Sequence, residues 1–221
     1  MLLVNDDDYY DTLEILRGNK KLPDIFLELK DWLKETYNVT AYNFIFKKIK
    51  YNPPYKFQLY ILLSSENEYN TMLHDFDYNE DKRLEIANKL YVLAQKHNLK
   101  KLHKYKDIWV CFNNFLVEMM TDINRCNYNK IEKELKKKFK NYSIWGIQPQ
   151  FDATYVFYYS DEDVKRNLEN GVSKQIKDDY FEELKKLDEF NVYTYDTFEM
   201  IFDSLENVDK NYKGNLYYYF K

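Results

Sequence analysis

The densest group of side chains that could carry out chemistry lies in the stretch LHDFDYNED. Four carboxylates and one histidine fall within eight residues there: His74, Asp75, Asp77, Glu80 and Asp81. Such a group could hold a divalent metal ion, as in a metal-dependent nuclease. Asp77 or Asn79 could instead cap the helix that follows, and acidic side chains favour the positive end of a helix. Capping accounts for most of these carboxylates, so the sequence predicts no metal site.

Other catalytic motifs are missing from the sequence. Cys111 and Cys126 have no adjacent histidine that would activate them as nucleophiles, and no Gly-x-Ser-x-Gly motif occurs. The four glycines are isolated and form no phosphate-binding loop. His97 and His103 lie among five lysines between residues 96 and 106, which would repel a metal ion. We therefore expect a protein that is not an enzyme and that needs no cofactor or small-molecule ligand.

The composition is typical of a compact folded protein. The 221 residues include 23 Tyr and 15 Phe but only four Gly and four Pro. This length suits one large domain or two small ones, and the aromatic side chains supply ample apolar surface for burial. The first ten residues lack the basic segment of a signal peptide, and no apolar run approaches the ~20 residues of a membrane span. With only two cysteines, the sequence predicts a cytoplasmic protein without a disulfide framework.

The elements that must position any site follow a definite order in the first half of the chain. A helix is expected after Pro23, because apolar residues recur at helical spacing from Ile25 to Tyr37. Two aromatic strands, a second helix and a β-hairpin with its turn at Asn113 and Asn114 are expected to follow. The expected ranges are helix 24–37, strands 41–51 and 55–65, helix 80–98, and strands 107–112 and 115–123.

The second half of the chain shows the same order of elements. Residues 196–209 could form a helix capped by Asp196, but the alternation of Phe198, Met200 and Phe202 favours a strand. The expected ranges are helix 129–142, strands 143–151 and 153–163, helix 177–190, and strands 197–204 and 215–221.

Together, the two halves predict an α+β fold. We expect two similar α-β-β-α-β-β units whose antiparallel sheets are covered by helices and which pack side by side. The first unit would comprise residues 1–125, including an acidic N-terminal extension, and the second would comprise residues 126–221.

Charge is distributed unevenly along the chain. The net charge of −4 and the pI near 5.6 argue against nucleic acid as a partner. Between residues 161 and 210 there are fifteen acidic and seven basic residues. An acidic surface speeds association with a basic protein, although such charges can also simply keep an aromatic-rich protein in solution.

The C-terminal stretch NLYYYFK is the most aromatic part of the chain. If it forms a strand, Tyr217 and Tyr219 face one way and Leu216, Tyr218 and Phe220 face the other. The face with Leu216 and Phe220 suits the core. Tyr217 and Tyr219 are then the side chains expected to cover the sheet or to meet a partner.

Three parts of the second half form one pattern: YVFYY, DDYFEELKKLDEF, and FEMIFDS followed by NLYYYFK. This pattern resembles the YezG-like bacterial immunity proteins, and the resemblance covers the second half of the chain more closely than the first. It implies a cytosolic α/β protein that neutralises a toxin domain by binding it and performs no catalysis. The chain departs from this family in that its sequence predicts two copies of the pattern.

The expected partner is therefore a protein, in particular a basic toxin domain. An acidic surface with aromatic anchors would occlude it. The residues expected to bind this partner are Asp161, Glu162, Asp163, Asp178, Asp179, Tyr217 and Tyr219. The alternative is a module that binds single-stranded nucleic acid, with the aromatic sheet faces as stacking platforms beside the lysine-rich segments.

Overall fold

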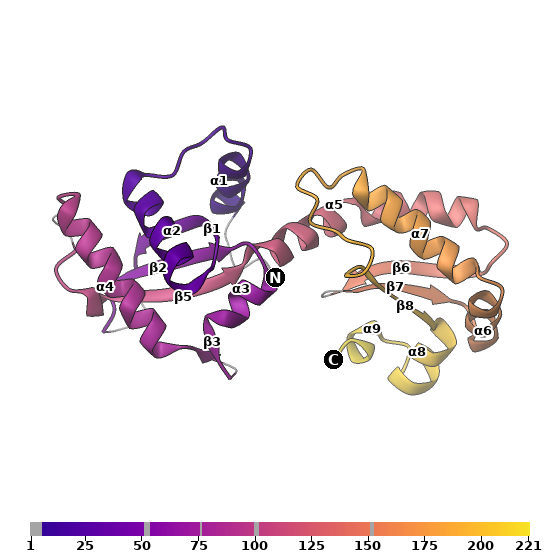
Figure 1. Cartoon of the computed structure of the whole chain (residues 1–221). Coiled ribbons are helices and arrows are strands. Elements are labelled where there is room, and N and C mark those ends of the chain that lie inside the picture. The colour runs from indigo at the N-terminus through magenta and orange to yellow at the C-terminus, as the bar shows by residue number, and fades with distance from the viewer. Residues whose placement is uncertain (1–5, 51–53, 76, 100–101, 151–152) are drawn as a thin grey trace. The chain divides into compact units, whose positions relative to one another are not determined.

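The computed structural model describes residues 6–50, 54–75, 77–99, 102–150 and 153–221. The chain divides into two compact units, residues 1–118 and 119–221, which are described separately below. The division falls inside a long helix, α5 (Phe115–Lys138), and the division predicted after residue 125 lies within the same helix. Both units combine helices with a three-stranded sheet, which confirms the predicted α+β class (Figure 1).

Unit 1 contains a sheet of three strands in the order β1-β2-β5. β1 pairs antiparallel with β2, and β5 pairs parallel with β2. The elements of the unit are α1 (Asp6–Leu16), α2 (Asp24–Tyr37), β1 (Ala41–Lys48), β2 (Phe57–Leu63), α3 (Glu66–Thr71), β3 (Leu73–His74), β4 (Asp77–Tyr78), α4 (Glu80–Lys96), η1 (Tyr105–Asp107), β5 (Ile108–Asn114) and the start of α5.

The start of α4 shows what the acidic stretch before it does. The side chain of Asn79 accepts a hydrogen bond from the backbone N–H of Lys82 at 3.1 Å, which confirms the predicted capping role. Glu80 and Asp81 lie in the first turn of this helix. Within the described residues, no three His, Cys, Asp or Glu side chains are grouped so that they could hold a metal ion.

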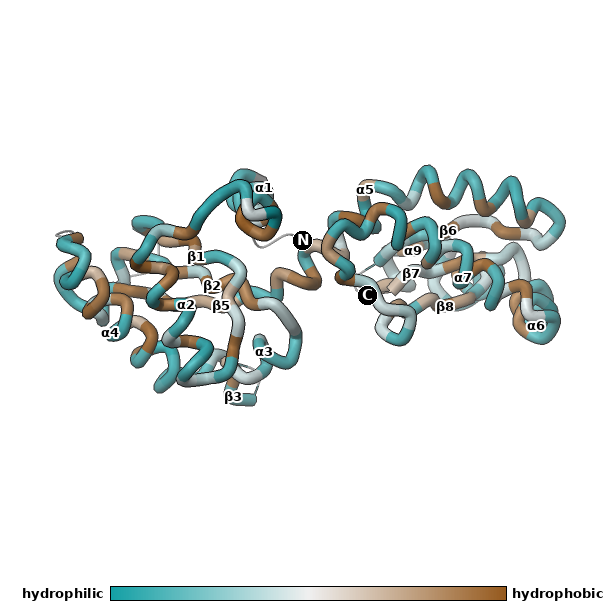
Figure 2. Tube along the Cα trace, turned by 45° about the horizontal axis from the view of Figure 1, so that its top comes forward, coloured by the Kyte–Doolittle hydropathy of each residue, from teal (hydrophilic) through white to brown (hydrophobic). Residues whose placement is uncertain are grey.

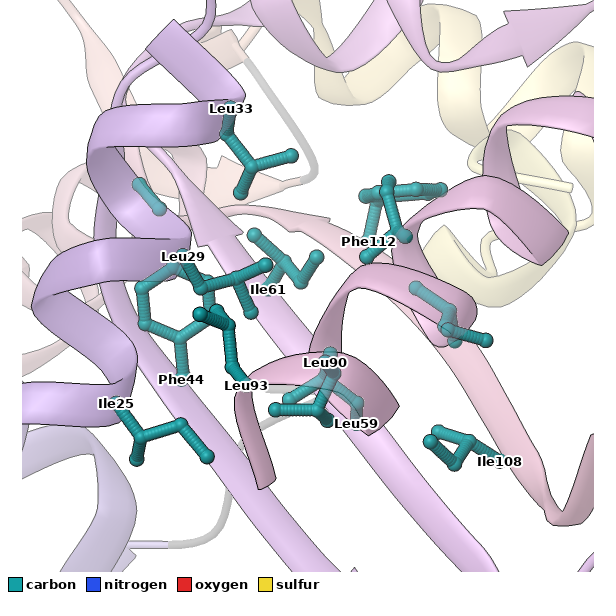
Figure 3. Close-up of a cluster of buried hydrophobic side chains, with 14 of the residues drawn as sticks. Ile25, Leu29, Leu33, Phe44, Leu59, Ile61, Leu90, Leu93, Ile108 and Phe112 are labelled. Carbon is teal, nitrogen blue, oxygen red and sulfur yellow. The ribbon is translucent and has the colours of Figure 1, made fainter. Parts of the chain in front are cut away.

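The core of unit 1 lies between the sheet and two helices. Side chains of α2 and α4 meet those of the strands, as Figure 3 shows for Leu29, Leu33, Leu90, Leu59 and Ile61. Each of these side chains is almost completely buried. Burial of a side chain of this size stabilises a fold by about 1.5–3 kcal/mol.

The predicted hairpin around Asn113 and Asn114 is wrong. The chain passes from β5 directly into α5, and Phe115 and Met119 are both buried on the same side of this helix. Apolar residues four apart indicate a helix, whereas the prediction relied on the turn-forming asparagines. Because β5 is parallel to β2, it is reached by a crossover through α3 and α4, and it needs no hairpin partner.

Unit 2 has a sheet with the order β6-β7-β8, in which β6 is antiparallel and β8 parallel to β7. Figure 2 shows α5 and α7 as mostly hydrophilic helices with hydrophobic residues at intervals, as expected for helices that cover a sheet. The elements after α5 are β6 (Ile144–Gln150), β7 (Ala153–Tyr158), α6 (Asp161–Glu169), α7 (Val172–Lys185), β8 (Glu199–Ser204), α8 (Leu205–Tyr212) and α9 (Leu216–Tyr219).

The two units share several features of topology. Each has the same strand order and strand directions, a register shift near the start of its first strand, and a helix capped by serine after its second strand. Each third strand runs directly into a helix. Both sheets are therefore mixed, and the prediction of antiparallel sheets was wrong for the third strand. The internal repeat stays a prediction.

The predicted strand at residues 215–221 is also wrong. Residues 199–204 form β8 as expected, but Ser204 then caps α8 by accepting a hydrogen bond from the N–H of Asn207 at 2.8 Å. Lys213 and Gly214 have φ values of 57° and 67°, and α9 begins after them. Within the described residues, no helix is long and apolar enough to cross a membrane.

The core of unit 2 contains buried tyrosines whose hydroxyl groups are all paired. Tyr180 donates to Asn124 Oδ1 at 2.6 Å, and its ring is stacked on Phe198. Tyr193 donates to the carbonyl oxygen of Met120 at 2.6 Å. Removal from water raises the pKa of Tyr180 and of Tyr193 well above the usual value near 10.

These raised pKa values predict a loss of stability at alkaline pH. A tyrosine that binds its proton more tightly when folded contributes stability that is fully present below about pH 10 and is lost as the pH rises. We expect Tyr180 to lower the free energy of unfolding by about 1.4 kcal/mol per pH unit between about pH 10 and 12. Urea denaturation of the wild type and of Tyr180→Phe at several pH values measures this difference. Equal slopes for the two proteins would contradict it.

Side chains of α5 form hydrogen bonds with the outward backbone groups of β6, an edge strand of the sheet in unit 2. Glu132 Oε1 accepts a hydrogen bond from the N–H of Ile147 at 3.1 Å, and Lys136 Nζ donates to the carbonyl oxygen of Trp145 at 2.5 Å. Pro149, further along β6, has no N–H to satisfy. These contacts protect an edge that could otherwise pair with another strand.

Replacing Glu132 by alanine should therefore destabilise unit 2. The N–H of Ile147 loses its acceptor, which costs about 1–3 kcal/mol where water cannot replace it. The matched control is Glu134→Ala on the same helix, since Glu134 is exposed and has no ion pair with any described residue. Urea denaturation should show a lower midpoint for Glu132→Ala alone. An equal shift in both variants would show that the contact adds nothing.

Candidate partner-binding surfaces

Three of the predicted partner-binding residues form the first turn of α6. Ser160 accepts a hydrogen bond from the N–H of Asp163 at 3.2 Å, and the carboxylate of Asp163 accepts one from the Ser160 hydroxyl at 2.8 Å. Arg166 forms an ion pair with Asp163. Asp163 therefore has a local capping role, which leaves little of its charge for a partner.

Asp161 is held by contacts to the start of α8. Its carboxylate accepts a hydrogen bond from the hydroxyl of Ser204, and Lys210 Nζ lies 3.7 Å from it. Its backbone N–H donates to Glu206 Oε2 at 3.0 Å. Glu162, between Asp161 and Asp163, is exposed and forms no ion pair with a described residue. Of the three acidic residues, Glu162 is the one that remains available to a partner.

Asp178 and Asp179 are also paired within unit 2. Asp178 forms an ion pair with Lys174 at 2.7 Å and accepts a hydrogen bond from the Tyr195 hydroxyl at 2.5 Å. The hydrogen bonds from Lys174 and Tyr195 lower the pKa of Asp178. Asp179 lies 2.5 Å from Lys138 Nζ. The charge count along the sequence therefore overstated the negative potential of this surface.

Some exposed carboxylates of unit 2 do remain without an ion pair to the described part of the chain. They are Glu134, Glu162, Glu169, Glu182, Asp196, Glu199 and Asp209. They can still attract a basic partner, mainly by speeding its association.

The two C-terminal tyrosines predicted to act together have different environments. Tyr219 packs against Tyr155 and Phe157, with ring centroids 5.9 and 5.3 Å away, and its hydroxyl donates to Asp203 Oδ2 at 2.6 Å. Burial and this hydrogen bond raise the pKa of Tyr219. Tyr217 is 67% exposed. Tyr219 is therefore an anchor of α9, and its predicted role as a partner contact has no geometric support.

Tyr218, and not Tyr219, is the second exposed tyrosine of this segment. It is 50% exposed, and its ring centroid lies 5.6 Å from that of Tyr217. The prediction missed this residue because a strand would have turned Tyr218 toward the core. In α9, the adjacent residues Tyr217 and Tyr218 instead project on neighbouring sides of one turn.

The conformation of α9 is fixed by contacts on both sides of this pair. Asn215 caps the helix by accepting a hydrogen bond from the N–H of Tyr217 at 2.8 Å. Phe220, like Tyr219, packs against Tyr155, with ring centroids 4.9 Å apart. The exposed pair therefore stands on a segment that is held in place before any partner binds.

A pocket of about 910 Å³ lies in unit 1 beside β1. Its wall is mainly apolar and includes the stacked rings of Phe46 and Phe57, whose centroids are 5.3 Å apart. Its lining also includes the charged residues Asp8, Asp11, Lys20 and Lys21, and Lys20 forms an ion pair with Asp11. Lys21 is exposed and has no ion pair within the described residues. This pocket could not be predicted from the sequence, because helices, strands and a loop far apart in the chain form it.

The aromatic faces of the two sheets are largely covered by helices. In unit 1, Phe44 is buried and stacked on Phe26 of α2, with ring centroids 5.2 Å apart. In unit 2, Phe157 is buried, and Tyr219 and Phe220 at the C-terminus pack on it. Nucleic-acid bases would need exposed rings for stacking. Phe44 and Phe157 are therefore not available as stacking platforms for single-stranded nucleic acid, whereas Phe46 of β1 is 37% exposed.

Fold and surfaces together define a two-unit α+β protein with an anchored, exposed tyrosine pair and an apolar pocket beside a sheet edge. Comparison of the chain with family models, with curated proteins and with solved structures gives no match.

Proposed function

We propose that this chain is a non-catalytic immunity protein, which binds a toxin domain and blocks its activity. The observation that carries the proposal is the tyrosine pair Tyr217 and Tyr218. Both rings are exposed, they contact one another, and α9 holds them in place. An exposed aromatic pair with a fixed backbone is typical of an interface anchor.

Binding energy would come mainly from these two rings. A tyrosine buries a large area while losing the freedom of only two side-chain torsions, and its hydroxyl can pair with a polar group of the partner. Because α9 is already ordered, little further entropy is lost when the complex forms.

The remaining free carboxylates of unit 2 favour a basic partner. Glu162 and Asp209 are both exposed and have no ion pair with a described residue. Their contribution is to orient and speed the encounter, which makes association sensitive to salt. The active-site clefts of nucleases bind phosphates and are commonly basic, so a nuclease toxin is the class of partner that fits these charges best.

Co-expression with the protein encoded beside it tests this function. If that neighbour is a toxin, cells that express both proteins should grow, whereas cells that express the toxin alone should not. The two proteins should also co-purify as a complex. Continued toxicity, with both proteins present in soluble form and no complex between them, would contradict the proposal.

A further inference from the structure

Within the part of the chain that the structure describes, the outer edge of β1 is open in the region next to the pocket. β1 is an edge strand, since the order of its sheet is β1-β2-β5. The N–H of Ile49 donates to the carbonyl oxygen of Lys56 at 2.9 Å. Ile49 and alternate residues before it therefore direct their backbone N–H and C=O groups toward β2. In an antiparallel pair the residues between them direct their N–H and C=O groups away from the partner strand. The backbone N–H and C=O groups of Phe44, Phe46 and Lys48 therefore point outward, away from β2.

The contrast with unit 2 gives this edge its significance. In β6, Glu132 and Lys136 form hydrogen bonds with the corresponding outward backbone groups, and Pro149 has no N–H to pair. In β1 the N–H of Phe44 is paired with Asn43 Oδ1 at 2.7 Å. Across the described residues, no hydrogen bond is seen for the N–H of Phe46 or Lys48, and both residues are exposed. Among the described residues, the outward backbone groups of the first strand are thus satisfied by α5 in unit 2, whereas those of Phe46 and Lys48 in unit 1 are left unpaired.

The surroundings of this edge specify a partner chemistry. Phe46 and Phe57 are among the apolar residues that line the pocket, and Lys21 lines it as well. Lys48 is two residues after Phe46 and so lies on the same face of the strand. Lys47 lies on the other face, where its Nζ is 5.3 Å from the ring centroid of Tyr60. Asp8 and Asp11 also line the pocket, and Asp11 is paired with Lys20. Apolar side chains would therefore find complementary groups in the pocket, and acidic side chains would find them at Lys21 and Lys48.

We propose that β1 accepts an extended, acidic and apolar peptide segment of a partner protein as a fourth strand. Backbone groups of Phe46 and Lys48 would pair with the segment, apolar side chains would enter the pocket, and acidic side chains would meet Lys21 and Lys48. Exposed lysines on an edge strand also discourage pairing with neutral or basic strands, which makes the acidic segment the selective occupant. This site goes beyond the proposed function, because it lies in the other unit and binds a partner of opposite charge.

A designed peptide provides the test. The probe is a fluorescein-labelled seven-residue peptide that alternates isoleucine and glutamate, and fluorescence anisotropy with the full chain measures binding. Lys48→Pro removes an outward N–H without touching the pairing with β2, and it imitates Pro149 of the other edge. We expect Lys48→Pro to bind at least about tenfold more weakly than Lys48→Ala, which lacks only the charge.

Further probes separate the possible outcomes. The same peptide with N-methyl groups at alternate residues should lose its binding, and a peptide of isoleucine and lysine should not bind. Circular dichroism should show that Lys48→Pro remains folded. Equal binding to Lys48→Pro and Lys48→Ala, or no binding of the acidic peptide, would overturn the proposal. Tight binding of laurate without peptide binding would identify the pocket as a site for small amphiphiles and would overturn it too. None of these measurements involves a toxin, so their failure leaves the proposed function untouched.

Discussion

Replacing Asp188 by alanine is expected to lower the free energy of unfolding of unit 2 by about 3–5 kcal/mol. Its carboxylate is completely buried and accepts hydrogen bonds from the N–H groups of Val192 and Tyr193, at 2.8 and 3.0 Å. It also pairs with Lys185 Nζ at 2.9 Å. The substitution leaves the two backbone donors without their acceptor and leaves the Lys185 ammonium group with only the oxygens of Asn191 and Tyr193.

The matched control is another ion pair in the same part of the chain. Glu183 lies 2.5 Å from Lys186, but both side chains are exposed to solvent. Glu183→Ala should therefore cost less than about 1 kcal/mol. Urea denaturation followed by circular dichroism measures both variants. Losses of similar size would show that the buried carboxylate does not organise the turn after α7.

Replacing Tyr217 and Tyr218 together by alanine should weaken the complex with the toxin domain by about a thousandfold. Anchor residues of an interface commonly contribute at least about 2 kcal/mol each, and two such losses correspond to about three orders of magnitude in Kd. The free energy of unfolding should stay within about 0.5 kcal/mol of the wild type, because both rings are exposed in the free protein.

Isothermal titration calorimetry with the purified toxin domain gives this affinity. Tyr10→Ala is the control, since Tyr10 is 58% exposed but belongs to unit 1. The control should bind like the wild type. If the double variant also retained the wild-type affinity, the tyrosine pair would not be the anchor.

Periodic segments of the sequence predicted their elements well. Helices were expected at residues 24–37 and 80–98, and the structure has α2 at Asp24–Tyr37 and α4 at Glu80–Lys96. Both have buried apolar residues at helical spacing and a clear start, at Pro23 and Asn79. In these segments local pattern and tertiary packing agree, which is the condition under which sequence reasoning succeeds.

The two wrong strand predictions share a physical cause. Residues 115–123 and 215–221 are rich in aromatic or β-branched residues, which favour strands on average. In the structure, each follows a parallel third strand at the edge of its sheet, and the chain needs no further strand there. Burial of Phe115 favours a helix in residues 115–123, and packing of Phe220 on Tyr155 favours a helical turn in residues 215–221.

The state of the charged residues could not be predicted from the sequence. Asp179 pairs with Lys138, and Asp161 lies near Lys210, so each partner is more than 40 residues away in the chain. Such pairs depend on how helices meet, which a charge count does not contain. The same holds for the pocket in unit 1 and for the difference between the two sheet edges.

If this chain is the proposed immunity protein, it inhibits a toxin domain by binding it. A titration of the purified toxin domain, where the neighbouring gene encodes one, with the purified chain tests this, with the toxin's own activity as the readout. We predict that toxin activity falls in proportion to the added protein and vanishes near an equimolar ratio. Full toxin activity in the presence of a large excess of the chain would contradict it.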